Sequence, residues 1–176
     1  IDKLDEKHPV KQYVINRKIP EKYFSKLLLS DKFMALVNKA KPGTFKKIIK
    51  DYPRLIIPFY DLQGKLFAFQ GRAFGDEQPR YITIKLDENK RRIYGLDRLD
   101  VNKKIYITEG PLDSLFLPNA IAVAGSDLEI PSLRKKSVYV FDNEPRSKEI
   151  INKMEKIIEK KYNICIWPKS LKYKDI

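Results

Sequence analysis

The feature that most constrains the fold is an alternation of short apolar runs with helical patterns over residues 103–168. Strand-like runs are expected at 104–108, 120–124, 137–141 and 164–167, and short helical segments at 112–117 and near Leu133. The segment 147–162 repeats apolar residues at helical spacing: Ile150, Ile151, Met154, Ile157 and Ile158. Apolar strands separated by helices favour a parallel sheet that helices cover on both faces. The predicted class is α/β.

Residues 1–50 carry helical patterns. Pro9 and Pro20 suit the first turn of a helix. Asp31 is placed to cap a helical segment over residues 33–37, and a further helix is expected from Thr44 to Ile49. This first part of the chain is therefore predicted to be a helical segment.

A hairpin is expected next, because two strand-like runs, Leu55–Tyr60 and Lys65–Phe69, are joined through Gln63-Gly64. A third strand is expected at Arg80–Ile84. The chain is therefore predicted to have three parts: a helical segment at 1–50, a mixed α/β basic subdomain at 51–101, and the strand–helix region at 102–176.

Composition favours a polyanionic partner. The chain has 36 Lys and Arg against 23 Asp and Glu, a net charge of +13, which is typical of proteins that bind nucleic acid. It is also compatible with a basic protein that has no such partner. One Cys and one His cannot supply the four ligands of a structural zinc site. No apolar run approaches the roughly 20 residues of a membrane span.

Carboxylates stand where two of the predicted strands end. Glu109 and Asp142 directly follow the runs 104–108 and 137–141, and Asp113 and Glu144 come shortly after them. Open α/β sheets bind ligands at the carboxyl ends of their strands. Neighbouring carboxylates repel one another, and a hard cation such as Mg²⁺ or Mn²⁺ relieves this repulsion through oxygen ligands. Each acid alone also fits a solvated turn or a helix cap, so it is the combination that predicts a metal site.

These residues also carry a family resemblance. Glu109-Gly-Pro-Leu-Asp113 followed by Phe141-Asp-Asn-Glu144 resembles the TOPRIM domain of DnaG-type primases, type IA and type II topoisomerases and some nucleases. Further segments look like consecutive signatures of the DnaG-type RNA polymerase core: Ile57–Gly64, Phe69–Arg72, Pro79–Tyr81 and Tyr94–Leu96. His8–Pro20 resembles the helical segment that phage primases have between their zinc-binding and catalytic regions.

The resemblance implies a TOPRIM-type parallel sheet flanked by helices over 102–176, preceded by a small α+β basic subdomain and the helical segment. It implies the catalytic core of a phage-type DNA primase, which makes short RNA primers on single-stranded DNA by metal-dependent nucleotidyl transfer. Glu109 would be the catalytic residue. The implied ligands of Mg²⁺ or Mn²⁺ are Glu109, Asp113, Asp142 and Glu144.

The chain departs from the family in three ways. Glu144 replaces the second Asp of the family's Asp-x-Asp, the family's zinc ribbon is not in this sequence, and the later acidic motif would begin at Asp175. Because the chain starts at Ile1, not Met, and stops at Lys174-Asp-Ile176 without a natural ending, we expect an excerpt of a longer protein.

Basic and aromatic side chains are the expected contacts to nucleic acid and nucleotides: Arg72, Arg80, Tyr81, Lys90, Arg91 and Arg92. Arg72 is the leading candidate, whereas 90–92 also fits a solvated loop. The lysines of 147–162 are expected on a solvated helix face.

Single-stranded DNA, nucleoside triphosphates and a replicative helicase are the implied partners, in the cytoplasm of a bacterial host. Two alternatives stay open at this point: a metal-dependent TOPRIM nuclease, and a non-catalytic single-strand-binding module.

Overall fold

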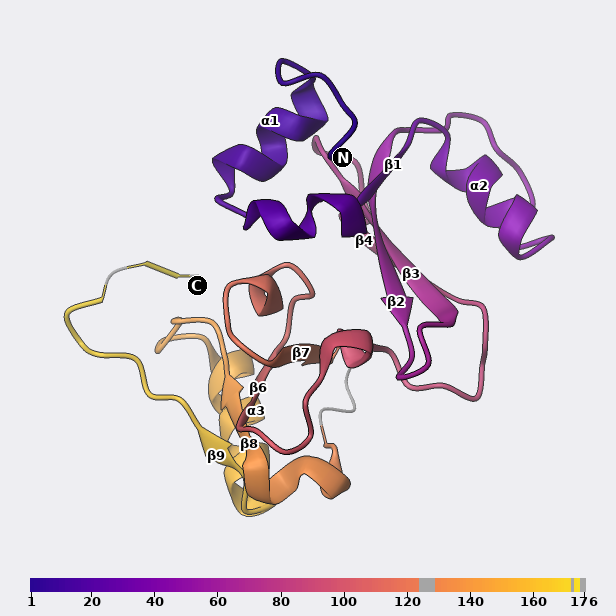
Figure 1. The fold of residues 1–176 in the computed structure, drawn as a ribbon. Helices are drawn as coiled ribbons and strands as arrows, with labels where there is room; N and C mark the ends of the chain where they lie inside the picture. The colour runs from indigo at the N-terminus through magenta and orange to yellow at the C-terminus, as the bar shows by residue number, and fades with distance from the viewer. Residues whose placement is uncertain (124–128, 172, 175–176) are drawn as a thin grey trace. The chain divides into compact units, whose positions relative to one another are not determined.

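The computed structural model describes residues 1–123, 129–171 and 173–174. The chain divides into two compact units, Ile1–Arg91 and Arg92–Ile176, coloured from indigo to yellow along the chain in Figure 1. The division into 1–50, 51–101 and 102–176 stays a prediction.

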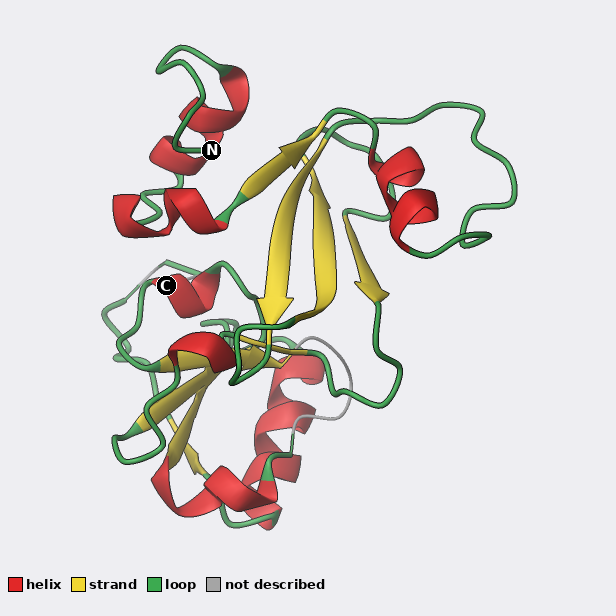
Figure 2. Cartoon of the chain, turned by 45° about the vertical axis from the view of Figure 1, so that its right-hand side comes forward, coloured by secondary structure: helices red, strands yellow, loops and turns green. Residues whose placement is uncertain are grey.

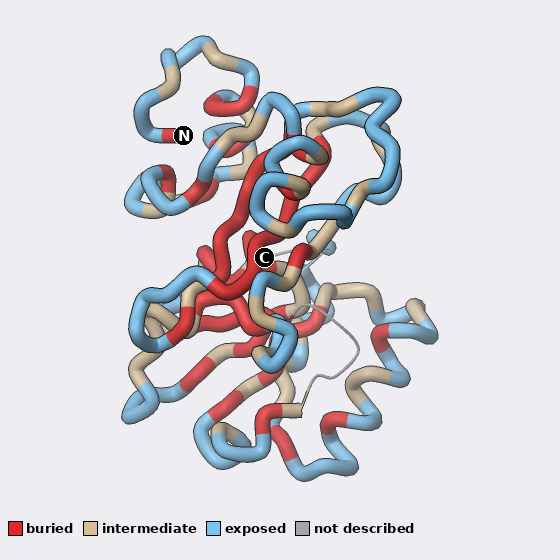
Figure 3. Tube along the Cα trace, turned by 90° about the vertical axis from the view of Figure 1, so that its right-hand side faces the viewer, coloured by how far each residue is buried: buried red, intermediate tan, exposed pale blue. Residues whose placement is uncertain are grey.

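The first unit is built on a four-stranded antiparallel sheet in the order β1-β2-β3-β4. Its elements are α1 (Pro9–Asn16), a 3-10 helix (Glu21–Lys26), β1 (Leu28–Ser30), α2 (Phe33–Ala40), β2 (Arg54–Tyr60), β3 (Leu66–Ala73) and β4 (Tyr81–Lys85). The predicted hairpin is confirmed, since β2 and β3 pair from Arg54↔Ala73 to Tyr60↔Leu66. Both strands are buried over most of their length (Figure 3).

Two expectations for the first 50 residues were wrong. The helix expected from Thr44 to Ile49 is irregular chain, because the Asn38 side chain bonds both backbone groups of Phe45, donating to its carbonyl at 2.9 Å and accepting from its N–H at 2.8 Å. Asp31 does not cap α2, since Lys32 directly precedes that helix.

The acceptor at the start of α2 comes from a later part of the chain. The Asp51 carboxylate accepts hydrogen bonds from the backbone N–H groups of Met34 at 2.8 Å and Ala35 at 2.9 Å. First-turn N–H groups lack a partner inside their own helix, so a carboxylate 16 residues downstream serves as well as a local one.

The second unit has a five-stranded sheet in the order β5-β7-β6-β8-β9. Figure 2 shows the strands of the chain in yellow and the helices in red. Its strands are β5 (Ile93–Tyr94), β6 (Ile105–Thr108), β7 (Ala120–Val123), β8 (Ser137–Val140) and β9 (Asn163–Ile164). Its helices are α3 (Lys148–Glu159) and three 3-10 helices at Leu96–Arg98, Asp113–Leu115 and Pro131–Lys136. Only β5 is antiparallel to its neighbour.

The predicted α/β class is therefore confirmed, although several boundaries differ. The helix expected at 112–117 is a single 3-10 turn, and the last strand is shorter and earlier than expected. Ser147 begins α3 by accepting a hydrogen bond from the N–H of Ile150. Ile150 and Ile157 then pack into one core with strand residues such as Ile107 and Tyr139. The strand expected to reach residue 124 ends at Val123, beyond which 124–128 lie outside the described residues.

No helix of the described residues is long and apolar enough to cross a membrane.

Candidate metal and nucleic-acid site

Glu109 and Asp142 both lie just beyond the carboxyl ends of neighbouring parallel strands in the second unit. Strands β6 and β8 are parallel neighbours, with Thr108 paired to Val140. Glu109 follows Thr108 directly, and Asp142 comes two residues after Val140. Because paired strands lie about 4.8 Å apart, the register brings these two acidic positions to one short stretch of the carboxyl edge.

The Glu109 carboxylate has one satisfied oxygen and one open oxygen. Its Oε2 accepts a hydrogen bond from Lys153 Nζ at 2.5 Å, and both side chains are 27% exposed. Its Oε1 is buried and has no hydrogen-bond partner among the described residues. A buried acceptor without a donor is costly, so this oxygen is the part of Glu109 that a bound cation would satisfy.

Lys153 bridges two carboxylates. It lies on α3 and also pairs with Glu149 Oε1 at 2.7 Å, one helical turn earlier. Partial burial of Lys153 alone would lower its pKa, but its hydrogen bonds to Glu109 and Glu149 outweigh burial and raise the pKa. The lysine therefore carries a firmly held positive charge against the end of β6.

The loop after β6 is tightly folded. Thr108 Oγ1 donates to the carbonyl of Gly110 at 3.0 Å, and Ser114 Oγ donates to the carbonyl of Pro111 at 2.7 Å. Asp113 folds back over the loop, so that a Cβ on Gly110 would lie 2.0 Å from Asp113 Oδ2. A larger residue at position 110 would require the Asp113 carboxylate to move.

Arg98, which precedes β6 in the sequence, holds this loop in place through hydrogen bonds. One of its terminal nitrogens donates to Ser114 Oγ at 2.8 Å and to the Ala120 carbonyl at 2.9 Å. The guanidinium lies 4.7 Å from the centroid of the Tyr94 ring. Gly95, at a φ of 89°, permits this arrangement, because a Cβ there would lie 2.6 Å from the guanidinium. The Tyr94–Leu96 signature thus supports the loop that bears Glu109.

The segment after β8 is held by the end of the chain. The Asn143 side chain donates to the carbonyls of Leu171 at 3.0 Å and Tyr173 at 2.9 Å. Glu144 Oε1 lies 3.0 Å from Lys174 Nζ. The position of Glu144 therefore depends on Leu171, Tyr173 and Lys174.

Comparison with known sequences finds similarity to DNA primases, although no protein-family model matches the chain. The DNA primase of Enterobacteria phage T4 is 41% identical over 180 residues, which is 100% of this chain and 52% of that protein. The DNA primase of Thermotoga maritima is 28% identical, over 69% of this chain and 25% of that protein. The chain thus spans about half the length of one curated relative and a quarter of the other.

Solved structures with the same fold are primases too. The zinc-binding and RNA polymerase domains of Aquifex aeolicus primase match with a TM-score of 0.68 and 19% identity, over 94% of this chain and 51% of that one. The E. coli primase catalytic core matches with a TM-score of 0.66 and 13% identity, over 94% and 68% of the two chains. The whole chain is thus similar in sequence to a DNA primase, and its fold is that of the primase catalytic cores.

The acidic residues at this edge of the sheet fit a divalent cation. The open Glu109 Oε1 and the carboxylates of Asp142 and Glu144 are hard oxygen donors. Within the described parts of the chain no three His, Cys, Asp or Glu side chains form a ready-made metal cluster. Mg²⁺ needs none, since it commonly uses one or two carboxylates with waters and substrate phosphates. Asp175, where a further acidic motif was expected, lies outside the described residues.

Arg72 is an internal anchor of the first unit. It is 2% exposed, and its guanidinium lies 4.4 Å from the Tyr13 ring centroid and 5.8 Å from that of Tyr81. It donates to the Ala73 carbonyl at 2.7 Å and to the Tyr81 hydroxyl at 3.4 Å. Burial raises the pKa of Tyr13, although Arg17 and Arg72 oppose the shift. Direct binding of nucleic acid by Arg72 stays a prediction.

The other predicted contacts differ in exposure. Tyr81 is 46% exposed, and Arg80, Arg91 and Arg92 are also exposed. Lys90 forms an ion pair with Asp61, and that hydrogen bond is the main cause of the lowered pKa of Asp61. Arg92 belongs to the second unit, and the other five candidates belong to the first.

Sequence reasoning missed Lys153. The expectation that the α3 lysines face solvent was wrong for this residue, which is only 27% exposed and paired with Glu109. A signal was present, because Lys153 follows Ile150 by three and precedes Ile157 by four, and residues at such spacing share a helix face. Both isoleucines are core residues.

Proposed function

We propose that this chain is the catalytic core of a phage-type DNA primase, with a TOPRIM domain, that joins ribonucleoside triphosphates into short primers on single-stranded DNA. The relation to phage T4 DNA primase along the whole chain supports this proposal. The observation that carries it is the buried, unpaired Oε1 of Glu109, which lies at the same carboxyl edge of the sheet as Asp142.

In this proposal, Glu109, Asp113, Asp142 and Glu144 hold Mg²⁺ or Mn²⁺. The bound cation would acidify the attacking 3′-hydroxyl and stabilise the charge of the triphosphate. Glu109 offers Oε1 as a direct ligand while Lys153 orients its other oxygen. Asp113, whose carboxylate lies over Gly110, would join the site through water.

The first unit would hold the template. It has 20 Lys and Arg against 11 Asp and Glu, a net charge of +9, which is suited to neutralising phosphates. Arg80 and Arg91 are exposed for this role, as is Arg92 just beyond the unit. The exposed face of Tyr81, steadied by Arg72, could stack on a base.

Nucleoside triphosphates are the proposed substrates, and a replicative helicase is proposed as a partner from the family resemblance alone. The proposed location is the cytoplasm of a bacterial host.

The test is Glu109→Gln in the intact protein, which keeps the size of the side chain but removes its charge. Losing one transition-state charge interaction is commonly worth about 10²–10³ in rate, so labelled-ribonucleotide incorporation on single-stranded DNA should fall at least that far. The exposed Glu155→Gln on α3 is the matched control and should leave synthesis unchanged.

Primer synthesis near the wild-type level in Glu109→Gln would reject the assignment of Glu109. Melting temperature and DNA titration of the same variant show whether the loss is chemical, because both should stay near wild type. Metal-dependent cutting of DNA without nucleotide incorporation would instead favour a TOPRIM nuclease, and DNA binding without either activity would favour a binding module.

A further inference from the structure

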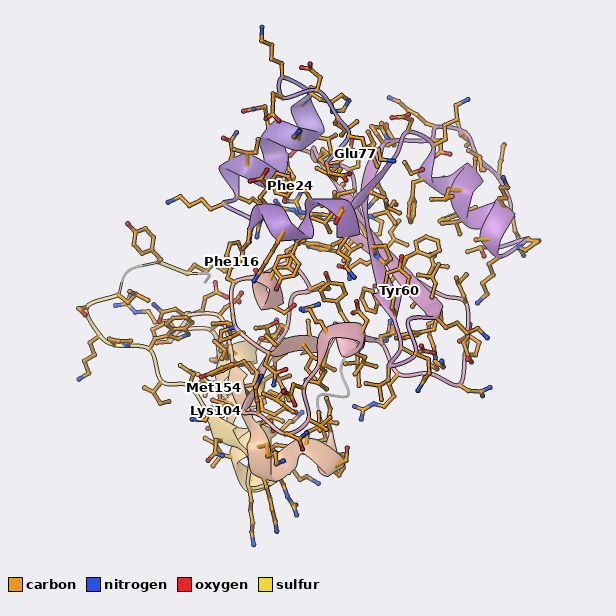
Figure 4. All side chains as sticks on the ribbon, in the orientation of Figure 1. Phe24, Tyr60, Glu77, Lys104, Phe116 and Met154 are labelled. Atoms are coloured by element: carbon orange, nitrogen blue, oxygen red, sulfur yellow. The ribbon has the colours of Figure 1, made fainter. Side chains whose placement is uncertain are left out.

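A lysine already holds the carboxylate to which the metal is assigned. Lys153 Nζ lies 2.5 Å from Glu109 Oε2 and 2.7 Å from Glu149 Oε1. The Glu149 side chain is 76% exposed, whereas that of Glu109 is 27% exposed. Ile150 and Ile157 of α3 pack into the core of the second unit. Lys153 directly precedes Met154, which is labelled in Figure 4.

We propose that Lys153 is a resident cation that competes with the divalent metal for Glu109 and so sets the metal affinity of the site. When metal binds, the lysine ammonium would leave Glu109 and remain on Glu149. This inference rests on the proposed metal site and adds a positioning residue to it.

The charge balance at Glu109 supports competition. Without metal, the lysine neutralises a half-buried carboxylate that would otherwise be costly to desolvate. With metal, an ammonium and a divalent cation on one carboxylate repel each other strongly, because the effective dielectric constant at such a site is well below that of water. Metal binding therefore favours separation of Lys153 from Glu109.

The geometry leaves a way for exchange to begin. Lys153 uses Oε2 and leaves the buried Oε1 of Glu109 without a partner among the described residues. Binding of a cation at Oε1 would satisfy an acceptor that the ion pair leaves unsatisfied, which favours the metal in the exchange. Because Oε1 is buried, the exchange requires the side chains of Glu109 and Lys153 to move.

Glu149 is an alternative ion-pair partner for Lys153 after metal displaces it from Glu109. The two residues are four apart on α3, a spacing at which Glu and Lys side chains meet, and their ion pair already exists. Displacement then requires only rotation about side-chain bonds of Glu109 and Lys153, with no movement of the helix. The ion pair with Glu149 therefore lowers the free-energy cost of releasing Glu109.

The test is Mn²⁺ titration calorimetry on the intact chain without nucleotide, comparing Lys153→Met with wild type. Removal of the competing charge should tighten Mn²⁺ binding by about tenfold. Lys153→Arg should retain competition and bind close to wild type. Glu149→Gln should weaken Mn²⁺ binding by about two- to fivefold, because Lys153 would lose its alternative partner. Lys156→Met, on the exposed face of α3, is the matched control and should change little.

Unchanged or weaker Mn²⁺ binding in Lys153→Met would overturn the competition and make Lys153 a structural support. Melting temperatures are measured in parallel. If Lys153→Met fails to fold, Lys153→Gln should bind Mn²⁺ more tightly than wild type and Glu149→Gln more weakly, and the absence of both changes would overturn the competition. Glu109→Gln separates this inference from the proposed function. If that change does not weaken Mn²⁺ binding, the metal site itself fails; if it does and Lys153→Met does not tighten binding, only the competition fails.

Discussion

At the scale of single residues, Arg72 shows how one motif position can serve the fold and the proposed function together. Its guanidinium lies between the rings of Tyr13 and Tyr81, on α1 and β4, while its own backbone is in β3. Such cation–π contacts are worth roughly 0.5–2 kcal/mol each, more when water is excluded. Arg72 thereby ties three elements together and orients the exposed Tyr81.

Arg72→Ala should therefore destabilise the first unit by about 2–4 kcal/mol, since it removes two ring contacts and leaves a buried cavity beside Tyr13. Arg72→Lys should recover only part of the loss, because an ammonium lacks the planar face that stacks on rings. Urea unfolding followed by circular dichroism measures both. The exposed Arg80→Ala should stay within about 0.5 kcal/mol of wild type, and an equally small effect of Arg72→Ala would contradict the anchoring role.

At the scale of elements, α2 depends on a residue far along the chain. Both of the hydrogen bonds from its first turn go to the two oxygens of Asp51. Residues 41–53, which connect α2 to β2, are irregular. Two hydrogen bonds between the Asn38 side chain and the Phe45 backbone hold this segment against α2. Removing the carboxylate leaves two helix N–H groups to be satisfied by water.

We expect Asp51→Ala to cost about 1–2 kcal/mol of stability, the usual range for loss of an N-terminal helix cap. Asp31→Ala is the matched control, because Asp31 is exposed and does not cap α2, and it should change stability by less than about 0.5 kcal/mol. Chemical unfolding of both variants measures the difference. A larger loss in Asp31→Ala would restore the capping role predicted for it.

The elements that could be predicted were those with a local signal. The β2–β3 hairpin and the strands β6 and β8 have dense apolar runs with clear breaks. Short strands such as β1 and β5 lack such a signal, because pairing across the sheet, and not local preference, forms them. Thr44–Ile49 failed as a helix because a side chain outside it bonds its backbone.

The same distinction applies to the candidate site. Glu109 and Asp142 could be placed at one sheet edge, since strand direction alone decides which ends meet. Lys153 could not be paired with Glu109 in the same way, because 44 residues separate them and the contact depends on how α3 lies on the sheet. Arg72 was recognised by its motif, but its ring partner Tyr13 arises only from packing of α1.

At the scale of the whole molecule, the positive charge is divided unequally. The first unit has a net charge of +9, and the second has 16 Lys and Arg against 12 Asp and Glu, a net of +4. The second unit also contains the proposed metal ligands. Affinity for the template should therefore come mainly from the first unit, and chemistry from the second.

Single-stranded DNA binding tests this division of charge. Replacing Arg80 and Arg91 together by Ala removes two exposed charges from the first unit. Replacing Lys148 and Lys156 by Ala removes two exposed charges from α3 and serves as the matched control.

Each lost phosphate contact should reduce the slope of log affinity against log salt by about 0.7. The arginine pair should thus lower the slope by about 1.4 and weaken binding at low salt, while the lysine pair should leave both nearly unchanged. Fluorescence anisotropy of a labelled oligonucleotide at several salt concentrations gives the two slopes. Equal slopes for the two variants would mean that DNA responds only to diffuse net charge, and the placement of the template on the first unit would have to be abandoned.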